Sequence, residues 1–416
     1  MSPDVLDRFL RYVKIHTTSK EDVDEIPSTK RQFDLANILA KEMKDLGVID
    51  ATVSDHCYVI GTLPSNLSPE LTQKVPVICL LAHMDTSPEE PGENVKPQII
   101  KNYQGGDIAL PGNPNIVISP KENPSLLKFV GSDIITSDGT TLLGGDDKAG
   151  IAIIMTVISI LKKAPNIKHG TIKIVFTPDE EVGHGVDALD VEALEADIGY
   201  TVDADEMGVL EMETFNAAGG TIRITGFNFH PGYAKGKLVN AVRIMGDIIT
   251  QFPKTEAPET TEKKEGFYHV YEANGSVNSA ELRFILRDFD YKLLKAKIKK
   301  LEAIVEKTSQ VYPKANIELD VKETYRNMKY KIEEVPYAIE YAEEAIKRTG
   351  LEVIKKSIRG GTDGARLSYK GLPTPNIFAG SINFHSKKEF VPVIALEKSV
   401  ETILNLIQIY VEKNAN

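Results

Sequence analysis

The sequence predicts an α/β protein with two domains. The larger domain is expected to carry a mostly parallel sheet with helices on both faces, and a smaller ferredoxin-like α+β lid domain is expected to interrupt it. Three observations support this prediction. Short apolar runs alternate with helical segments in the first half of the chain, as in parallel sheets with crossover helices. From about residue 217 the order becomes strand, helix, strand, strand, helix, strand, which is that of a ferredoxin-like unit. At 416 residues, the chain is also too long for a single core.

Apolar periodicity places the elements of the larger domain. Ser28 opens a helix whose apolar residues recur every three or four positions, and Gly47 ends it. An apolar, β-branched run at 74–81 predicts a buried strand. The same reasoning gives an amphipathic N-terminal helix, helices at 148–161, 335–348 and 396–411, and strands at 171–176, 198–202, 353–357 and 374–378. The stretch 88–131 is rich in Pro, Gly and Asn, so we expect a functional loop or local hairpins there.

A change in the order of the predicted strands and helices indicates an inserted domain. Strands are predicted at 221–225, 267–271, 281–286 and 317–321, and helices at 236–252 and 291–311. We therefore predict a discontinuous main domain formed by residues 1–214 and 326–416, and a lid domain formed by residues 215–325.

Composition excludes several classes of protein. The net charge is −11 and no basic run stands out, which argues against nucleic acid and anionic membranes as partners. No apolar stretch is long enough to span a bilayer, and the N-terminus lacks the pattern of a secretory signal. The two cysteines, Cys57 and Cys79, favour reduced thiols over a disulfide. These features predict a cytoplasmic protein.

Acidic and imidazole side chains gather directly after predicted strands. Four segments do so and a fifth lies near the C-terminus: His83 with Asp85, Asp146 with Asp147, Asp179 to Glu181, Asp203 with Asp205, and His385. Ligands of open parallel sheets bind outside the carboxyl ends of the strands, so these segments can converge. Imidazole and carboxylate groups suit borderline and hard divalent ions, and two ions need a bridging carboxylate.

The spacing within these segments indicates that neighbouring residues have different roles. In His83-x-Asp85, the carboxylate can fix the tautomer and angle of a ligating imidazole. Glu180 and Glu181 diverge from one another, so one can bind metal while the other serves as a base. Each motif alone is more simply read as a chance match or a solvated turn. Their occurrence together, in this order, favours a metal site.

Longer segments give a resemblance to a known family. They are HMDTSP, NVKPQIIKNYQGGDIAL, TLLGGDDKAGIA, FTPDEEVG, YTVD, HPGYAKGKLVNA, EGFYHV, LRDFD, RGGTDGARLSYKGLPTPNIF and the final H-x-x-x-E-F. Nearly end to end, the chain resembles the cocatalytic dizinc exopeptidases, a superfamily that includes aminoacylases and succinyl-diaminopimelate desuccinylase. The insert NVKPQIIKNYQGGDIAL and the long RGGTDGARLS segment resemble its aminotripeptidase branch in particular.

The resemblance implies two Zn²⁺ ions per subunit, for which Co²⁺ or Mn²⁺ can substitute. The positions that match the superfamily's ligands are His83 and Asp203 for one ion, Glu181 and His385 for the other, and Asp146 as the bridge. By the same likeness, Asp85 orients His83 and Glu180 is the general base. Asp203 is followed by Ala204 and Asp205 where glycines are expected, which affects the local backbone rather than the ligand.

The implied function is a metal-dependent aminopeptidase that hydrolyses the N-terminal residue from tripeptides, using a dizinc-bound hydroxide and a glutamate general base. The implied partners are a short peptide substrate and a second subunit in a homodimer. Candidate substrate-binding residues are His230, Asn240, Arg287, Arg359 and Gly360. Arg287 and Asp288 could equally form an internal ion pair. Two alternatives stay open: an N-acyl amino acid amidohydrolase or carboxypeptidase-like relative, and a catalytically silent peptide-binding protein.

Overall fold

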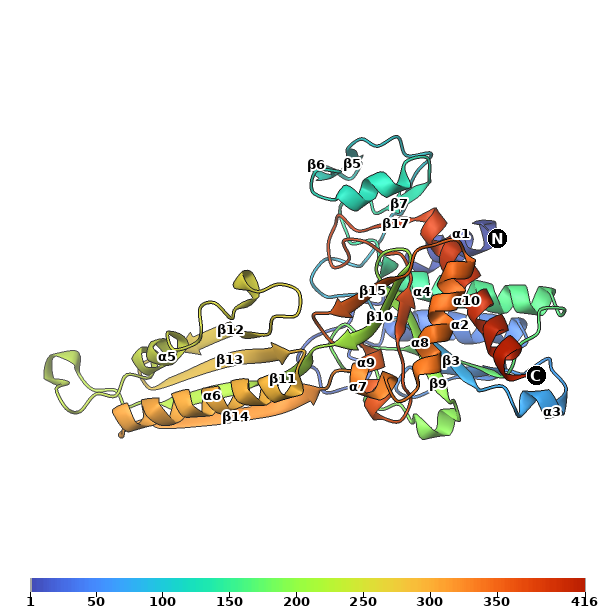
Figure 1. Ribbon diagram of the computed structural model, residues 1–416. Coiled ribbons are helices and arrows are strands. Elements are labelled where there is room, and N and C mark those ends of the chain that lie inside the picture. Colours follow the sequence, from blue (N-terminus) through green and yellow to red (C-terminus); the bar gives the residue numbers. More distant parts are fainter. Residues whose placement is uncertain (1, 416) are drawn as a thin grey trace. The chain divides into compact units, whose positions relative to one another are not determined.

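The structure, a computed structural model, describes residues 2–415 (Figure 1). It divides into two compact units. The larger comprises Met1–Met212, Tyr330–Lys356 and Thr362–Asn416, and the smaller comprises Glu213–Lys329 and Ser357–Gly361. The segment 215–325, predicted as an inserted domain, lies within the smaller unit. Its role as a lid stays a prediction.

The larger unit is built on an eight-stranded sheet. Its strands, in spatial order, are β1 (Ile49–Val53), β2 (Val59–Leu63), β8 (Ile172–Thr177), β3 (Ile78–His83), β9 (Ile198–Ala204), β16 (Asn376–Phe378), β10 (Val209–Thr214) and β15 (Ile354–Ile358). The four central strands, from β8 to β16, pair in parallel. Strands β1, β2 and β10 pair antiparallel at the flanks. The predicted α/β class is confirmed, with its parallel pairing concentrated in the middle.

Helices cover both faces of this sheet. One layer contains α1 (Ser2–Tyr12), α2 (Gln32–Asp45), α4 (Gly145–Lys163), α8 (Pro336–Arg348) and α10 (Val393–Asn414). Helix α4 is buried along nearly its whole length and packs on β3 and β9. On the other face, Leu367 of α9 (Asp363–Tyr369) packs against Leu81 and Val175 in a separate core cluster. Two short helices, α3 (Pro69–Thr72) and α7 (Lys329–Ile332), complete the set.

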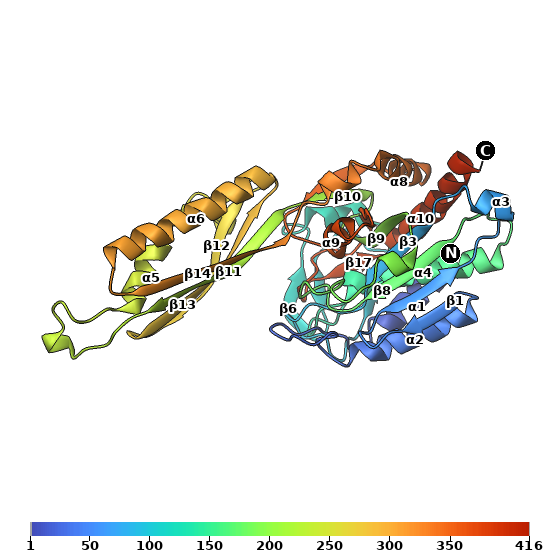
Figure 2. The same ribbon diagram turned by 90° about the horizontal axis from the view of Figure 1, so that it is seen from below.

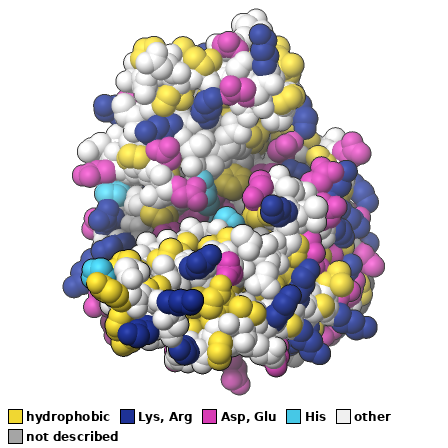
Figure 3. Space-filling model, turned by 90° about the vertical axis from the view of Figure 1, so that its left-hand side faces the viewer, with side chains coloured by type: hydrophobic (Ala, Val, Ile, Leu, Met, Phe, Trp, Pro, Cys, Tyr) yellow, Lys and Arg dark blue, Asp and Glu magenta, His cyan; other side chains and the backbone are white. Residues whose placement is uncertain are grey.

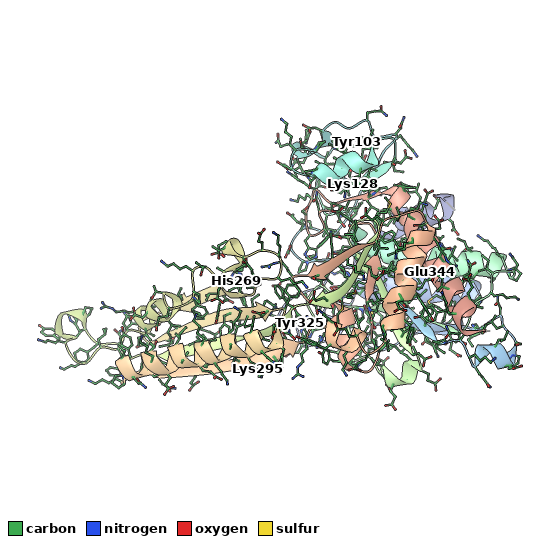
Figure 4. All side chains as sticks on the ribbon, viewed as in Figure 1. Tyr103, Lys128, His269, Lys295, Tyr325 and Glu344 are labelled. Atoms are coloured by element: carbon green, nitrogen blue, oxygen red, sulfur yellow. The ribbon has the colours of Figure 1, made fainter. Side chains whose placement is uncertain are left out.

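The segment between β3 and α4 folds locally, as the sequence suggested. It contains β4 (Gln98–Ile100), β5 (Ile108–Leu110), β6 (Asn113–Ile118), the 3-10 helix η1 (Pro124–Phe129) and β7 (Ile134–Thr136). Strands β5 and β6 form a hairpin, and β4 and β7 join β17 (Phe390–Pro392) in a three-stranded sheet. This excursion is the cyan part of Figure 1, and its residues Tyr103 and Lys128 are labelled in Figure 4. Its core includes Ile382 and Phe390, so it supports the segment around His385.

The smaller unit has the predicted ferredoxin-like order. Its antiparallel sheet runs β12 (Phe267–Gly275), β13 (Ser279–Asp288), β11 (Asn216–Thr225), β14 (Asn316–Tyr325). Helices α5 (Ala241–Ile249) and α6 (Tyr291–Val311) pack together on this sheet and share its core (Figure 2). Helix α6 has the predicted bounds. Helix α5 begins five residues later than predicted, because the Asn240 side chain accepts from the Arg243 amide and caps the helix there. Three 3-10 turns, η2 (Glu192–Leu194), η3 (Pro231–Tyr233) and η4 (Pro258–Thr260), lie in the connections of the two units.

On the face seen in Figure 3, Lys and Arg side chains are interspersed with Asp and Glu. Cys57 and Cys79 are both buried as free thiols. Among the helices of residues 2–415, none combines the length and apolar character needed to cross a membrane.

Candidate metal centre

The central parallel strands bring three of the predicted segments to one edge of the sheet. His83 is the last residue of β3 and pairs in register with Thr177, the last residue of β8. The turn that follows β8 carries Glu180 and Glu181. Asp203 lies near the end of β9, the other neighbour of β3. Because parallel strands point the same way, their carboxyl ends present these side chains to one site.

The carboxylate of Asp146 lies between two imidazoles. Its Oδ1 is 2.8 Å from Nε2 of His83, and its Oδ2 is 3.4 Å from Nε2 of His385. Each oxygen therefore faces a different histidine. Burial alone would raise the pKa of Asp146, but the hydrogen bonds from His385 and His83 lower it. A carboxylate with its two oxygens directed at two separate ligand groups has the geometry that a bridge between two ions requires.

One half of the site is formed by His83 and Asp203. Oδ1 of Asp203 is 3.6 Å from Nε2 of His83. On the other side of the ring, Nδ1 of His83 lies 3.2 Å from Oδ1 of Asp85 and 3.1 Å from the Asp85 carbonyl oxygen. A proton on Nδ1 is thereby held by Asp85, and Nε2 is the ring nitrogen directed at the site. Burial lowers the pKa of His83, yet its bonds to Asp146 and Asp85 raise it well above the usual value.

The other half is formed by Glu181 and His385. Oε2 of Glu181 is 2.7 Å from Nε2 of His385. Burial and the nearby Asp146 charge raise the pKa of Glu181 to about 7. Burial would lower the pKa of His385, but its bonds to Asp146 and Glu181 raise it to about 11. The ring of His385 therefore lies between two acidic side chains that both favour its protonated form.

Asp85 connects the histidine and glutamate segments. Besides its contact with His83, its carboxylate accepts the Glu180 amide at 3.0 Å and the Glu181 amide at 3.2 Å. The side chain is fully buried. One carboxylate thus contacts the ring of His83 and the backbone that presents both glutamates, and its role in orienting a metal ligand stays a prediction.

Asp147 differs from Asp146 in its partners. Its Oδ2 accepts the His83 amide at 3.2 Å, and its Oδ1 accepts the Gly150 amide at 3.0 Å. The peptide between Asp146 and Asp147 is cis. Asp147 also lies within 4.8 Å of ligand atoms of His83 and Asp203, so it forms part of a second candidate ligand group. Its carboxylate is committed to backbone amides, and the imidazoles face Asp146.

A buried aspartate shapes the turn that carries the two glutamates. Asp179 has a positive φ of 51°, a conformation that non-glycine residues seldom adopt. Its carboxylate accepts the Ser28 amide at 2.6 Å and the Gln32 side-chain amide at 2.6 Å. These bonds from the start of α2 and the segment before it hold the turn after β8 in place, so Glu180 and Glu181 project from a fixed backbone.

The donor set fits divalent metal ions. The atoms that converge are imidazole nitrogens and carboxylate oxygens, which are ligands for Zn²⁺, Co²⁺ and Mn²⁺. The groups His83, Asp146 and Glu181 place ligand atoms within 4.8 Å of one another. Oε1 of Glu181 is buried and has no hydrogen-bond partner among the described residues. Because an unpaired buried carboxylate oxygen is costly, a bound cation would satisfy it.

The remaining predicted site residues belong to the smaller unit. The Asn240 side chain is engaged as the cap of α5. His230 lies on an exposed loop, where its Nδ1 accepts the Gly232 amide at 3.2 Å and its ring lies 5.2 Å from that of Tyr233. Arg287 donates to the carbonyls of Ala218 and Leu286. Its neighbour Asp288 points to the opposite face of β13, because successive strand residues alternate.

Arg359 and Gly360 lie in the segment Ser357–Gly361 of the smaller unit. The guanidinium of Arg359 donates to the carbonyls of Lys263 at 2.7 Å and Glu265 at 3.0 Å, and it stacks 5.2 Å above the ring of Phe215. These contacts give Arg359 a structural role within that unit. Substrate binding by it and by Gly360 stays a prediction.

Two buried acids near the site were not singled out from the sequence. Asp363 accepts the Thr177 hydroxyl at 2.7 Å, and burial raises its pKa to about 6. Glu389 accepts backbone amides of the loop that carries Asp146. Both stand inside motifs that the resemblance uses, RGGTDGARLS and H-x-x-x-E-F. Their positions inside these motifs are the signal in the sequence that could have pointed to the two residues.

Comparisons with known proteins show relatives that match nearly the whole chain. The profile described as "Peptidase family M20/M25/M40" matches residues 139–409. Peptidase T of Clostridium acetobutylicum is 46% identical over 410 residues, covering 99% of this chain and 100% of that protein. The crystal structure of aminopeptidase PepT from Bacillus cereus is 25% identical with a TM-score of 0.76, covering 99% of each chain. A tripeptidase structure from Staphylococcus aureus is 24% identical with a TM-score of 0.78 and covers 99% of each chain, which shows a shared fold.

The family profile spans more than half of the chain, and the relative from Clostridium acetobutylicum is similar over nearly all of it. The predicted resemblance and the predicted enzyme class are therefore confirmed. The chain belongs to peptidase family M20/M25/M40, as a metal-dependent exopeptidase similar over its full length to peptidase T.

Proposed function

We propose that this enzyme is an aminopeptidase that releases the N-terminal residue of tripeptides with the help of two divalent metal ions. The observation that carries the proposal is the Asp146 carboxylate, whose oxygens face His83 and His385. Similarity to peptidase T and to an aminopeptidase structure supports the substrate class. Zn²⁺ is the proposed native ion, and Co²⁺ or Mn²⁺ would substitute because the same nitrogen and oxygen ligands suit them.

The five ligands divide into two pockets with one shared group. His83 and Asp203 would hold the first ion, and Glu181 and His385 the second, with Asp146 between them. The unpartnered Oε1 of Glu181 supports this assignment. Three ligating carboxylates would offset much of the charge of two divalent ions, so the loaded site would hold few uncompensated charges.

Bound ions of this kind would polarise the scissile carbonyl and lower the pKa of a water molecule, so that the water can lose a proton and attack near neutral pH. Glu180 would accept the proton of the attacking water and return it to the leaving amine nitrogen. Its amide is fixed by Asp85, and burial raises the pKa of its carboxyl well above the usual value. Asp85 would hold His83 in the tautomer that leaves Nε2 free.

Substrate recognition is proposed to involve the smaller unit. His230 would donate to the oxyanion that develops on the peptide carbonyl, and Asn240, Arg287, Arg359 and Gly360 would bind the peptide backbone or carboxylate. A homodimer and a cytoplasmic location belong to the same proposal.

The test compares four substrates derived from one tripeptide sequence: the free tripeptide, its N-acetylated form, its C-terminal amide and a dipeptide taken from the same sequence. We expect release of the N-terminal residue from the free tripeptide, loss on chelation, and recovery with Zn²⁺ or Co²⁺. N-acetylation should abolish cleavage, since the free α-amine marks an aminopeptidase substrate. Preferred cleavage of the acetylated form would instead establish an N-acyl amino acid hydrolase, and absence of any hydrolysis with two ions bound would reject a peptidase function.

A further inference from the structure

Glu389 is an almost fully buried carboxylate surrounded by hydrogen-bond donors. It is 1% exposed. Its Oε2 accepts the amides of Leu143 and Gly144, each at 2.8 Å. Its Oε1 accepts the Asp146 amide at 3.0 Å and the Ser381 hydroxyl at 2.8 Å. A carboxylate with four donors in the interior is strongly fixed, since removing any partner would leave a buried polar group unpaired.

Three of these donors belong to the loop that leads into α4 and ends in Asp146, whose backbone angles are not yet helical. Gly144 has a φ of 79°, in the left-handed region. A Cβ on Gly145 would come within 2.9 Å of Oε1 of Glu389 and 2.7 Å of the Ser381 hydroxyl, so the backbone approaches Glu389 as closely as glycine allows. The loop therefore wraps around the carboxylate, and the position of the Asp146 backbone depends on it.

The fourth donor and Glu389 itself belong to the segment that carries His385. Ile382 and Phe390 exchange two backbone hydrogen bonds of 3.0 Å, which close a loop with His385 within it. Ser381 and Glu389 stand at the two ends of this loop. His385 has a positive φ of 58°. Glu389 thus joins the base of the His385 loop to the loop that positions Asp146.

We propose that Glu389 is a positioning residue that sets the spacing between Asp146 and His385, and thereby the affinity of the Glu181–His385 metal pocket. The inference rests on the two-metal function proposed above. Glu389 contacts none of the reacting groups in this assignment. It acts through the Asp146 amide and through the loop that holds His385.

The His83–Asp203 pocket has separate support. His83 is fixed by Asp85 and by the end of β3, and Asp203 by β9. Because Asp146 is shared, loss of Glu389 should weaken both pockets, and it should weaken the second more strongly, since the loop that holds His385 also depends on Glu389. A role limited to general folding would weaken both pockets to the same extent, or neither.

The variant Glu389→Gln preserves size and removes the charge. One of its two terminal atoms becomes an NH₂ group, which cannot accept from an N–H or O–H donor. At least one of the four donors therefore loses its acceptor. Ser381→Ala is a milder second variant, because it removes one donor and leaves the three backbone bonds. Glu401→Gln, which affects a glutamate paired with Lys398 on α10, is the matched control.

The experiment uses the full-length protein stripped of metal with a chelator. Zn²⁺ is titrated in competition with a chromophoric chelator, Co²⁺ absorption reports ligand geometry, and thermal unfolding of the metal-free proteins reports folding. We expect Glu389→Gln to lose about 10- to 100-fold in affinity for the second ion and less for the first. Ser381→Ala should show a smaller loss of the same kind, and Glu401→Gln none.

Two results would overturn the inference. One is an unchanged second affinity in both Glu389→Gln and Ser381→Ala. The other is an equal loss at both sites. If Glu389→Gln does not fold, Ser381→Ala decides alone. The proposed function fails separately: a wild-type protein that binds two ions but hydrolyses no peptide leaves the positioning inference standing, whereas a wild-type protein that binds only one ion removes its basis.

Discussion

The two halves of the metal centre are built in different ways. His83 and Asp203 lie on neighbouring strands in the middle of the parallel sheet, and the His83 side chain is 2% exposed. Glu181 and His385 lie on loops, and the His385 side chain is 31% exposed. Strand ends are held by their ladders on both sides, whereas loops depend on individual hydrogen bonds. One pocket is therefore fixed by the fold, and the other is fixed by a few buried carboxylates.

The outer partners of the two histidines show the same difference. Nδ1 of His83 faces Asp85, which is fully buried and also binds the amides of Glu180 and Glu181. Nδ1 of His385 faces Glu89 at 3.4 Å, and the Glu89 side chain is 64% exposed. An exposed carboxylate competes with water for its partner and orients it weakly. The second pocket therefore needs other support, which we assign to Glu389.

The largest effect should come from the group that the two halves share. Replacing Asp146 with Ala removes one ligand from both ions and leaves His83 and His385 without their common partner. We expect loss of both metals and of turnover. Metal analysis after gel filtration checks this prediction. Retention of two ions by the variant would show that Asp146 is not the bridge and would favour Asp147.

The next effect concerns chemistry rather than binding. Glu180→Gln should keep both metals, because Glu180 is outside both pockets, and should lower turnover by about 10²- to 10⁴-fold, the usual contribution of a general base. Steady-state kinetics with a tripeptide and metal analysis of the same preparation test it. Near-normal turnover would remove Glu180 from the base role.

The contrast between the outer partners can be tested with a matched pair of variants. Asp85→Asn should reduce metal affinity by about 10- to 100-fold, as expected for a buried carboxylate behind a ligating histidine. Glu89→Gln should change it only a few-fold, because surface pairs contribute little. Competition titrations with Zn²⁺ measure both. Equal losses would mean that exposure does not distinguish the two histidines.

The smallest effect is the release of protons on metal binding. The pKa of His385 is raised to about 11 in the metal-free protein, so this residue is protonated at pH 7 and must lose its proton to bind an ion. Apparent affinity for the second ion should therefore rise with pH up to about 11, with at least one proton released when that ion binds. Calorimetry in buffers of different ionisation enthalpy counts these protons. His385→Ala should abolish that release while the first ion still binds.

Much of the fold could be predicted because the helices and central strands have clear periodicity. Helix α6 has the predicted bounds, and the central strands begin or end within a few residues of the predictions. The flanking strands β1, β2 and β10 were not predicted, and their antiparallel direction depends on the path of the chain rather than on local pattern. The late start of α5 depends on a single side chain, Asn240.

The convergence of the predicted ligand residues could be foreseen from residue type and position, whereas their roles as ligands stay predictions. His83, Asp146, Glu181, Asp203 and His385 converge, because each follows a strand or an established motif. The roles of Asp179, Asp363 and Glu389 could not be predicted, since the groups that they bind belong to distant segments of the chain. Only the three-dimensional structure shows that the Glu389 carboxylate binds the amides of a loop more than 240 residues earlier in the chain.

We propose that five ligands on strands and loops form two adjacent metal pockets around one carboxylate. Anomalous diffraction from crystals loaded with Zn²⁺ tests it most directly. We predict two peaks about 3.5 to 4 Å apart, one beside His83 and Asp203 and the other beside Glu181 and His385, with Asp146 between them. A single peak, or peaks away from Asp146, would rule out two metal pockets that share this carboxylate.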